Sequence, residues 1–197
     1  MADPAWAPLL PERFASLPRS RRPSLRLAIT AARLATRGRS HHFVRAMATS
    51  PRTFWPFLTL NGRLMLRGTL GRRDTELVIL RVAALCGSRY EWTQHVPLAR
   101  RVGVTPEVIA AAGVPAMTSV VSPQPISPQD RMLLDAVDEL VLTHTVSDPT
   151  WRALQERFPP RTLMELCMLV GNYAMLAGAL NAFGVPLEAP WASAPGR

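Results

Sequence analysis

The sequence predicts an all-α protein with seven to nine helices, and three observations lead to this prediction. No segment shows the alternation of apolar and polar residues that is typical of a β-strand. The breaks between apolar segments carry residues that begin and end helices, with Ser, Thr or Asp before Pro at the starts and Gly at the ends. Near the C-terminus, small residues recur at helical spacing. We therefore expect helices packed around one core.

The first part of the chain begins with residues 1–23, which are rich in Pro and Arg and predict an irregular surface segment. Helices are expected over residues 24–37, 41–49 and 53–67. The segment "GTLGRRD" then turns the chain, and Asp74 is placed to cap the helix "TELVILRVAALCG". Gly87 is expected to end that helix.

The second part of the chain is punctuated more clearly. Gly103 is expected to stop a helix that begins at 88, and Thr105 with Pro106 fits the start of a short one. After a linker with several prolines over 122–127, "SPQD" is typical of a capping box with Pro at the first helical position. The remaining helices are expected from there to about His144, from Asp148 to Pro159, and from 161 to 183.

The last of these helices contains the longest apolar run, residues 166–185. Three polar side chains interrupt this run, so its apolar parts are shorter than the ~20 residues that a membrane span needs; these are Asn172, Tyr173 and Asn181. We expect a buried core helix and no membrane. Four small residues at helical spacing predict a smooth stripe for close contact with another helix, namely Gly171, Ala174, Gly178 and Ala182.

The net charge of +9 is concentrated at one end of the chain. Residues 1–73 hold 14 Arg against two acids, whereas residues 74–197 hold 9 Arg against 12 acids. No helix-turn-helix, zinc knuckle or aromatic strip accompanies the basic segment, so we expect no nucleic-acid partner. We divide the chain into an Arg- and Pro-rich N-terminal arm over 1–40 with a possible helix, a single all-α domain over 41–188 and a flexible tail over 189–197.

Cys86 and Cys167 lie far apart in apolar stretches, which indicates reduced thiols and a cytoplasmic protein rather than a disulfide framework. The absence of lysine, with abundant Ala, Pro and Gly, favours a bacterial source. No set of His, Cys, Asp and Glu has metal-ligand spacing, and no Gly-rich loop could cradle a phosphate. We expect neither a metal nor a cofactor.

The stretch "CGSRYEWTQH" at 86–95 is the candidate site. On a helix that starts at Ser88, the side chains of Ser88, Glu91 and His95 share one face. A carboxylate one turn from an imidazole can hold its tautomer and raise its pKa, and Trp92 beside them would line a pocket. A second interpretation stays open, because Ser88-x-x-Glu91 is also a capping box that would merely close the helix end.

The segment "GTLGRRDTELVILRVAALCGSRYEWTQHVPLARRVGVTPEVI", with the closing "ELCMLVGNYAMLAGALNAFGV", resembles the carboxymuconolactone decarboxylase family of the AhpD-like (alkyl hydroperoxidase D) superfamily. The resemblance extends from about residue 40 and implies an AhpD-like helical fold. It also implies homo-oligomers, often trimers or multiples of them. Redox members use Cys-x-x-Cys-x-x-x-His with a glutamate from the preceding helix, which here places the histidine at His95 and the glutamate at Glu76.

The two cysteine positions of that motif hold Ser88 and Glu91, so the dithiol is missing. Dithiol peroxidase chemistry needs an attacking and a resolving thiol. The resemblance therefore favours a cofactor-free lyase, decarboxylase or isomerase that acts on a small carboxylated or enolisable molecule. In this hypothesis His95 is the acid, Glu91 its orienting group or alternate base, and Glu76 the relay.

Two alternatives remain: an AhpD-like thiol oxidoreductase that uses Cys86, and a non-catalytic oligomer that binds a ligand or partner. For substrate binding we predict Ser88, Trp92, Arg67, whose guanidinium could pair with a substrate carboxylate, and His42. His42 could equally be a solvated residue at a helix start.

Overall fold

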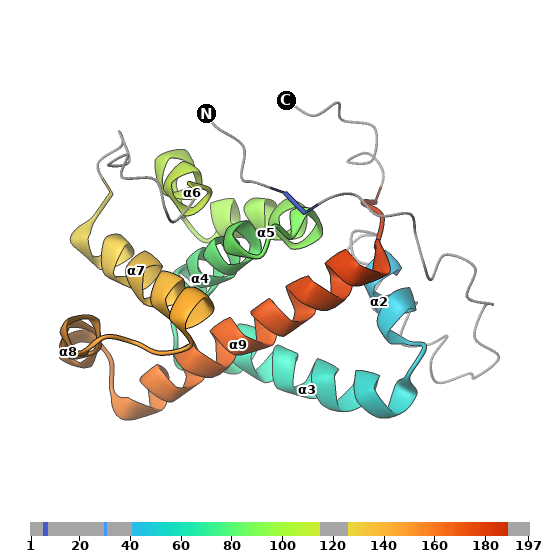
Figure 1. Ribbon diagram of the computed structural model, residues 1–197, viewed down its shortest axis with the longest axis horizontal. Helices are drawn as coiled ribbons and strands as arrows, with labels where there is room; N and C mark the ends of the chain where they lie inside the picture. Colours follow the sequence, from blue (N-terminus) through green and yellow to red (C-terminus); the bar gives the residue numbers. More distant parts are fainter. Residues whose placement is uncertain (1–5, 8–29, 31–40, 115–125, 189–197) are drawn as a thin grey trace.

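The computed structural model of the chain describes residues 6–7, 30, 41–114 and 126–188. Within them are eight helices and no strand, which confirms the predicted all-α class (Figure 1). The helices are α2 (His41–Met47), α3 (Pro51–Arg67), α4 (Arg72–Leu85), α5 (Arg89–Arg101), α6 (Pro106–Ala112), α7 (Pro128–Thr143), α8 (Asp148–Arg157) and α9 (Pro160–Phe183). The helix expected over 24–37, except for Thr30, and the tail from 189 lie outside the described residues.

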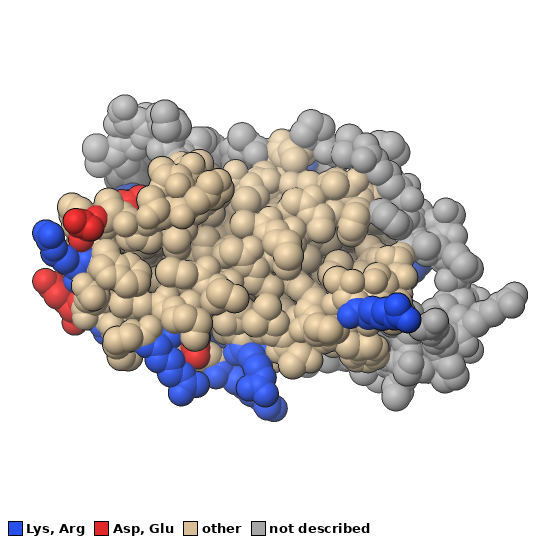
Figure 2. Space-filling model, turned by 60° about the horizontal axis from the view of Figure 1, so that its bottom comes forward, with Lys and Arg blue, Asp and Glu red and all other residues tan. Residues whose placement is uncertain are grey.

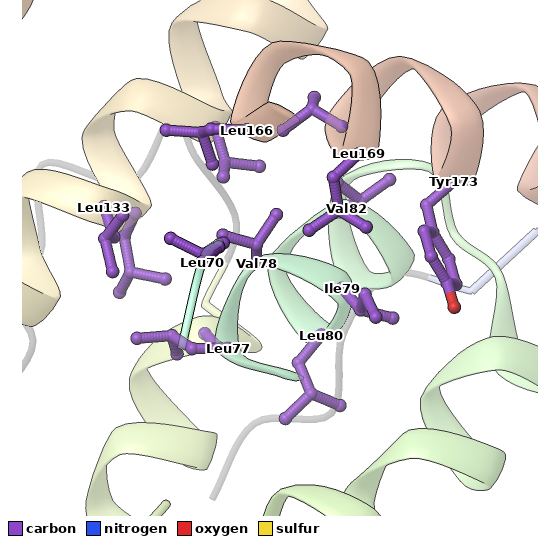
Figure 3. Packing of buried hydrophobic residues seen from close by; sticks show 14 of the residues in the cluster. Leu70, Leu77, Val78, Ile79, Leu80, Val82, Leu133, Leu166, Leu169 and Tyr173 are labelled. Carbon is purple, nitrogen blue, oxygen red and sulfur yellow. The ribbon is translucent and has the colours of Figure 1, made fainter. Parts of the chain in front are cut away.

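Helix α4 is the centre of the core. Every residue from Asp74 to Ala83 is buried, because α5, α7 and α9 pack against different sides of the helix. Figure 3 shows Val78, Val82 and Leu80 of α4 pointing toward different neighbours, with Leu166 and Leu169 of α9 on one side. A helix buried all round needs apolar residues on every face, which "LVILRVAAL" provides.

Polar side chains on α4 are paired across the core. Arg81 donates to Asp138 of α7 and to the carbonyl oxygens of Ala112 and Val114. Asp74 accepts from Arg157 of α8 at 2.7 Å. These ion pairs satisfy charges that would otherwise be costly to bury, and they fix α4 relative to α7 and α8.

The predicted start of α4 was wrong. The helix begins at Arg72 with Gly71 in the N-cap position, so Asp74 lies in the first turn rather than at the cap. Its carboxylate is used for the contact with Arg157 instead. Other predicted caps are confirmed: Thr105 Oγ1 accepts from the backbone of Val108, and Ser127 Oγ accepts from that of Asp130.

Helix α9 crosses the molecule beside α3 and α4 (Figure 1). By length and composition it is a helix that could cross a membrane, and half of its most apolar window is buried against the rest of the chain. The predicted smooth stripe makes no close helix contact within the described residues. Gly171, Gly178 and Ala182 are exposed, and Ala174 is half-buried.

Candidate functional site

A buried carboxylate–imidazole pair joins the two helices that precede and follow Gly87. Glu76 of α4 is fully buried, and its Oε2 lies 2.7 Å from Nδ1 of His95 on α5. Because an ionised carboxylate only accepts hydrogen bonds, Nδ1 carries the proton in this contact. That tautomer leaves Nε2 of His95 to accept a proton from another group.

The other carboxylate oxygen of Glu76, Oε1, also accepts a hydrogen bond. Arg72, one turn earlier on α4, donates from Nη2 to Glu76 Oε1 at 2.7 Å and also to the carbonyl oxygen of Met65. The arginine offsets the charge of the buried carboxylate, so Glu76 is held in one orientation from both sides. Sequence reasoning missed Arg72, because the helix was expected to begin after it.

Tyr173 of α9 forms the third side of the site. Its ring meets the ring of His95 edge-to-face, with 5.4 Å between centroids, and its hydroxyl lies 3.1 Å from Sδ of Met65. Burial raises the pKa of Tyr173, and the nearby carboxylates of Glu91 and Glu76 raise it further, so the phenol stays neutral. The sequence marked Tyr173 only as an interruption of an apolar run.

Glu91 lies one turn before His95 on α5 and has no hydrogen-bond partner among the described residues. Only 2% of Glu91 is exposed, and Ser88, which is fully buried, also leaves its hydroxyl without a partner. Ser88 stands at the N-cap position of α5 but makes no side-chain cap hydrogen bond. The capping-box interpretation was therefore wrong, and two buried polar groups remain available to a ligand.

Burial raises the pKa of the Glu91 carboxyl to about 8, and the nearby Ser88 hydroxyl offsets only part of this effect. Glu91 is therefore mainly protonated near neutral pH and can donate a hydrogen bond. Glu91 was expected to hold the His95 ring in its orientation, but Glu76 does so instead.

Cys86 and the turn that follows it lie beside this site. Burial raises the pKa of the Cys86 thiol to about 11, and the Glu91 carboxylate contributes to the rise. Gly87 adopts a positive φ of 61°, and its carbonyl oxygen accepts from the backbone of Ala7 at 2.9 Å. Trp6, the residue before Ala7, also contacts α5, since its ring lies 5.7 Å from that of Trp92, which is half-buried.

His42 belongs to a neighbouring polar cluster around Glu188. Its backbone donates to Glu188 Oε1, and its Nδ1 lies 3.0 Å from the carbonyl oxygen of Pro186. Glu188 is 1% exposed and also accepts from the Tyr90 hydroxyl at 2.6 Å and from Gln94 Nε2 at 2.7 Å. This cluster ties the segment after α9 to α5 and was not predicted.

The structure brings together Glu76, Glu91, His95 and Ser88, with Trp92 on the same helix. Arg67 instead ends α3 with an exposed side chain and no described contact to the Glu76–His95 pair. Among the described residues, no group of three or more His, Cys, Asp or Glu side chains is positioned to hold a metal ion. The arrangement is thus a buried cluster that combines a carboxyl of raised pKa with an oriented imidazole, which are groups suited to proton transfer.

Fold and site together define an all-helical protein with a buried carboxylate–imidazole pair. Residues 51–133 match the model of the carboxymuconolactone decarboxylase family, the family that the sequence resembles. No match was found among the curated proteins.

A similar fold occurs in the crystal structure of an uncharacterized peroxidase-related protein from Silicibacter sp. TM1040. The two chains superpose with a TM-score of 0.75 at 15% sequence identity, over 92% of this chain and 95% of the other. At that identity the likeness shows the shared fold alone.

Proposed function

We propose that the protein is a cytoplasmic, cofactor-free acid–base enzyme of the lyase or isomerase type, acting on a small carboxylated or enolisable molecule. The observation that carries the proposal is the buried Glu76–His95 pair beside an unpartnered Glu91. Catalysis by proton transfer needs one group that is oriented and one that is protonated at working pH, and these residues meet both needs. Two free cysteines, Cys86 and Cys167, agree with a reducing compartment.

In the proposed decarboxylation, the bond between the substrate carbon and its carboxylate breaks, and carbon dioxide leaves. The electron pair of that bond stays on the substrate as an enolate. The protonated Glu91 and the Ser88 hydroxyl donate hydrogen bonds to the enolate oxygen, where negative charge develops. The carbon takes its proton from Nε2 of His95, which has first picked up that proton from solvent, so that the imidazolium returns to the neutral form. Nδ1 keeps its own proton toward Glu76, which holds the imidazole in place throughout. Isomerisation would use the same groups, with His95 removing a proton from carbon first.

The deep burial of the Glu76–His95 pair supports a small substrate. Only 11% of the His95 side chain is accessible, and Glu76 is fully enclosed. Residues 6–7 and α9 approach the same region from two directions. Such enclosure strengthens the electrostatic interactions of buried groups with a bound molecule.

The test is exchange of carbon-bound protons for deuterium in a panel of small lactone acids and keto acids, followed by NMR. We expect the wild type to exchange or decarboxylate at least one class, and His95→Gln to slow this by ~10²–10⁴. Glu156→Gln, which changes an exposed carboxyl on α8, is the matched control and should have no effect. Equal rates in wild type and His95→Gln would refute the proposal.

A thiol oxidoreductase is the second candidate, because the Silicibacter protein is called peroxidase-related. The environment of Cys86 argues against a thiol oxidoreductase. A thiol whose pKa is raised to about 11 is almost wholly protonated at neutral pH and is a poor nucleophile. The position of the resolving thiol is occupied by Glu91.

A further inference from the structure

The chain has two tyrosines, and their hydroxyl groups have very different hydrogen-bond partners. Both residues are buried, since Tyr90 on α5 is 6% exposed and Tyr173 on α9 is 2% exposed. The Tyr90 hydroxyl donates to a carboxylate oxygen of Glu188 at 2.6 Å. The Tyr173 hydroxyl donates to the thioether of Met65 at 3.1 Å. A buried tyrosine normally finds a strong acceptor for its hydroxyl, so the thioether is an unusual partner.

Packing alone does not account for the hydroxyl of Tyr173. A thioether sulfur is a weak acceptor compared with a carboxylate or carbonyl oxygen. Burial of a hydroxyl that makes only such a bond is unfavourable, whereas phenylalanine would fill the same space without a polar group. The hydroxyl therefore resembles the unpartnered oxygens of Ser88 and Glu91, because each is a buried polar group whose good partner would come from a ligand.

Neighbouring side chains hold the phenol oxygen of Tyr173 in place. Burial raises the pKa of Tyr173 well above its ordinary value, and a hydrogen bond with the Asn61 side chain of α3 offsets part of the rise. A hydrogen bond with this effect is one that the amide donates to the phenol oxygen. Asn61 is itself held, because its Oδ1 accepts from Nδ2 of Asn172 at 2.8 Å. The phenol thus keeps its own proton, which points to the Met65 sulfur.

Tyr173 lies beside the Glu76–His95 pair. Its ring meets that of His95 edge-to-face, and the charges of Glu91 and Glu76 both act on the phenol. Figure 3 shows the Tyr173 side chain extending away from α9, with the hydroxyl oxygen at its far end. A molecule that contacts His95 and Glu91 is therefore expected close to this hydroxyl.

The Met65 side chain can give way to a ligand. It is half-buried, unbranched and rotatable about three bonds, so the sulfur can leave the phenol without movement of the backbone. The backbone of Met65 is fixed separately, because its carbonyl oxygen accepts from Arg72. Figure 2 turns the side of the molecule where α3 lies toward the viewer and shows a broad area without charged side chains. A displaced thioether would meet apolar surroundings there.

We propose that the Tyr173 hydroxyl is a further hydrogen-bond donor to the substrate, and that it exchanges the Met65 thioether for a carbonyl or carboxylate oxygen when the substrate binds. The stronger acceptor makes this exchange favourable. The inference rests on the proposed function, because it adds a contact to the same bound molecule.

The test separates turnover from stability in two matched variants that each remove one hydroxyl. The substrate is the lactone acid or keto acid that the wild type turns over fastest. Tyr173→Phe should lower kcat/KM about 10-fold or more, while its Tm stays within about 2 °C of the wild type or rises, because only a weak bond is lost. Tyr90→Phe should lower Tm by about 3–8 °C, since Glu188 loses a donor, and should leave turnover unchanged.

A second variant tests the exchange of acceptors. Met65→Gln brings an amide oxygen within reach of the Tyr173 hydroxyl, and this acceptor is stronger than the thioether. It should compete with the substrate and raise KM several-fold. Combining Met65→Gln with Tyr173→Phe should add little to the loss caused by Tyr173→Phe alone, because the new acceptor then has no donor to occupy.

Two results would overturn this inference and leave the proposed function standing. The first is wild-type turnover in Tyr173→Phe beside a slow His95→Gln, and the second is a Tm of Tyr173→Phe that falls as far as that of Tyr90→Phe, which would assign the hydroxyl to structure. Additive losses from Met65→Gln and Tyr173→Phe would refute the exchange at Met65. If His95→Gln also matches the wild type, the proposed function fails, and this inference fails with it.

Discussion

The Glu91→Gln variant should become more stable relative to the wild type as the pH rises. The loss of a helix cap would have the opposite effect. The folded pKa of this carboxyl is about 8, against 4.5 for an ordinary glutamate. Between pH 4.5 and about pH 8, the folded chain therefore binds more protons than the unfolded chain. The free energy of unfolding of the wild type therefore falls as the pH rises through this window, and levels off above it.

The size of the effect follows from the linkage relation. Each pH unit inside the window costs about 1.4 kcal/mol for a single fully shifted group. Between pH 6 and pH 8, where the carboxyl begins to ionise in the folded state, the wild type should lose roughly 2 kcal/mol that Glu91→Gln keeps. For a chain of this length, that corresponds to a difference in Tm that widens by about 4–8 °C.

The assay is thermal unfolding of both proteins at pH 6, 7 and 8 in buffers of equal ionic strength. Glu156→Gln removes the same charge from an exposed position and should follow the wild type at every pH. The same slope in wild type and Glu91→Gln would refute the reasoning. So would a variant that becomes relatively less stable at pH 8, since a charged and well-partnered Glu91 would behave that way.

Three further outcomes are expected. Glu76→Gln and His95→Gln should each lower turnover by ~10²–10⁴, and the double variant should lose little more, which steady-state kinetics of all three would show; additive losses would contradict a coupled pair. Cys86→Ser should leave turnover nearly unchanged, and the wild type should not reduce peroxides with a dithiol donor. Glu188→Ala should lower the free energy of unfolding by about 3 kcal/mol in urea, because the Tyr90 hydroxyl loses its acceptor; a stable variant would show that the cluster is replaceable.

The parts of the fold that could be predicted are those with a local cause. Thr105 before Pro106 and Ser127 before Pro128 begin helices because the hydroxyl accepts from the backbone three residues later, and this requires no tertiary partner. The start of α4 was misjudged for the opposite reason. Asp74 suits a cap, but Arg157 from a distant helix attracts its carboxylate, and nothing near Asp74 in sequence indicates that contact.

The candidate site likewise has one part that local sequence predicts and another that depends on tertiary packing. Spacing along α5 placed Glu91 and His95 on one face, and the family resemblance added Glu76. Spacing alone could not tell which carboxylate holds the imidazole, because that depends on how α4 crosses α5. The answer is Glu76, at 2.7 Å. Tyr173 approaches from a helix far along the chain, so its contact with His95 has no local pattern at all.

Helix α9 contributes to the site through its buried face. The ring of Tyr173 lies edge-to-face against that of His95, and Leu166 and Leu169 of the same helix pack into the core beside α4 (Figure 3). Because these core contacts fix α9 relative to α4, they also fix the phenol ring relative to the imidazole. A change at Tyr173 would therefore alter the surroundings of His95 without removing the hydrogen bond between His95 and Glu76.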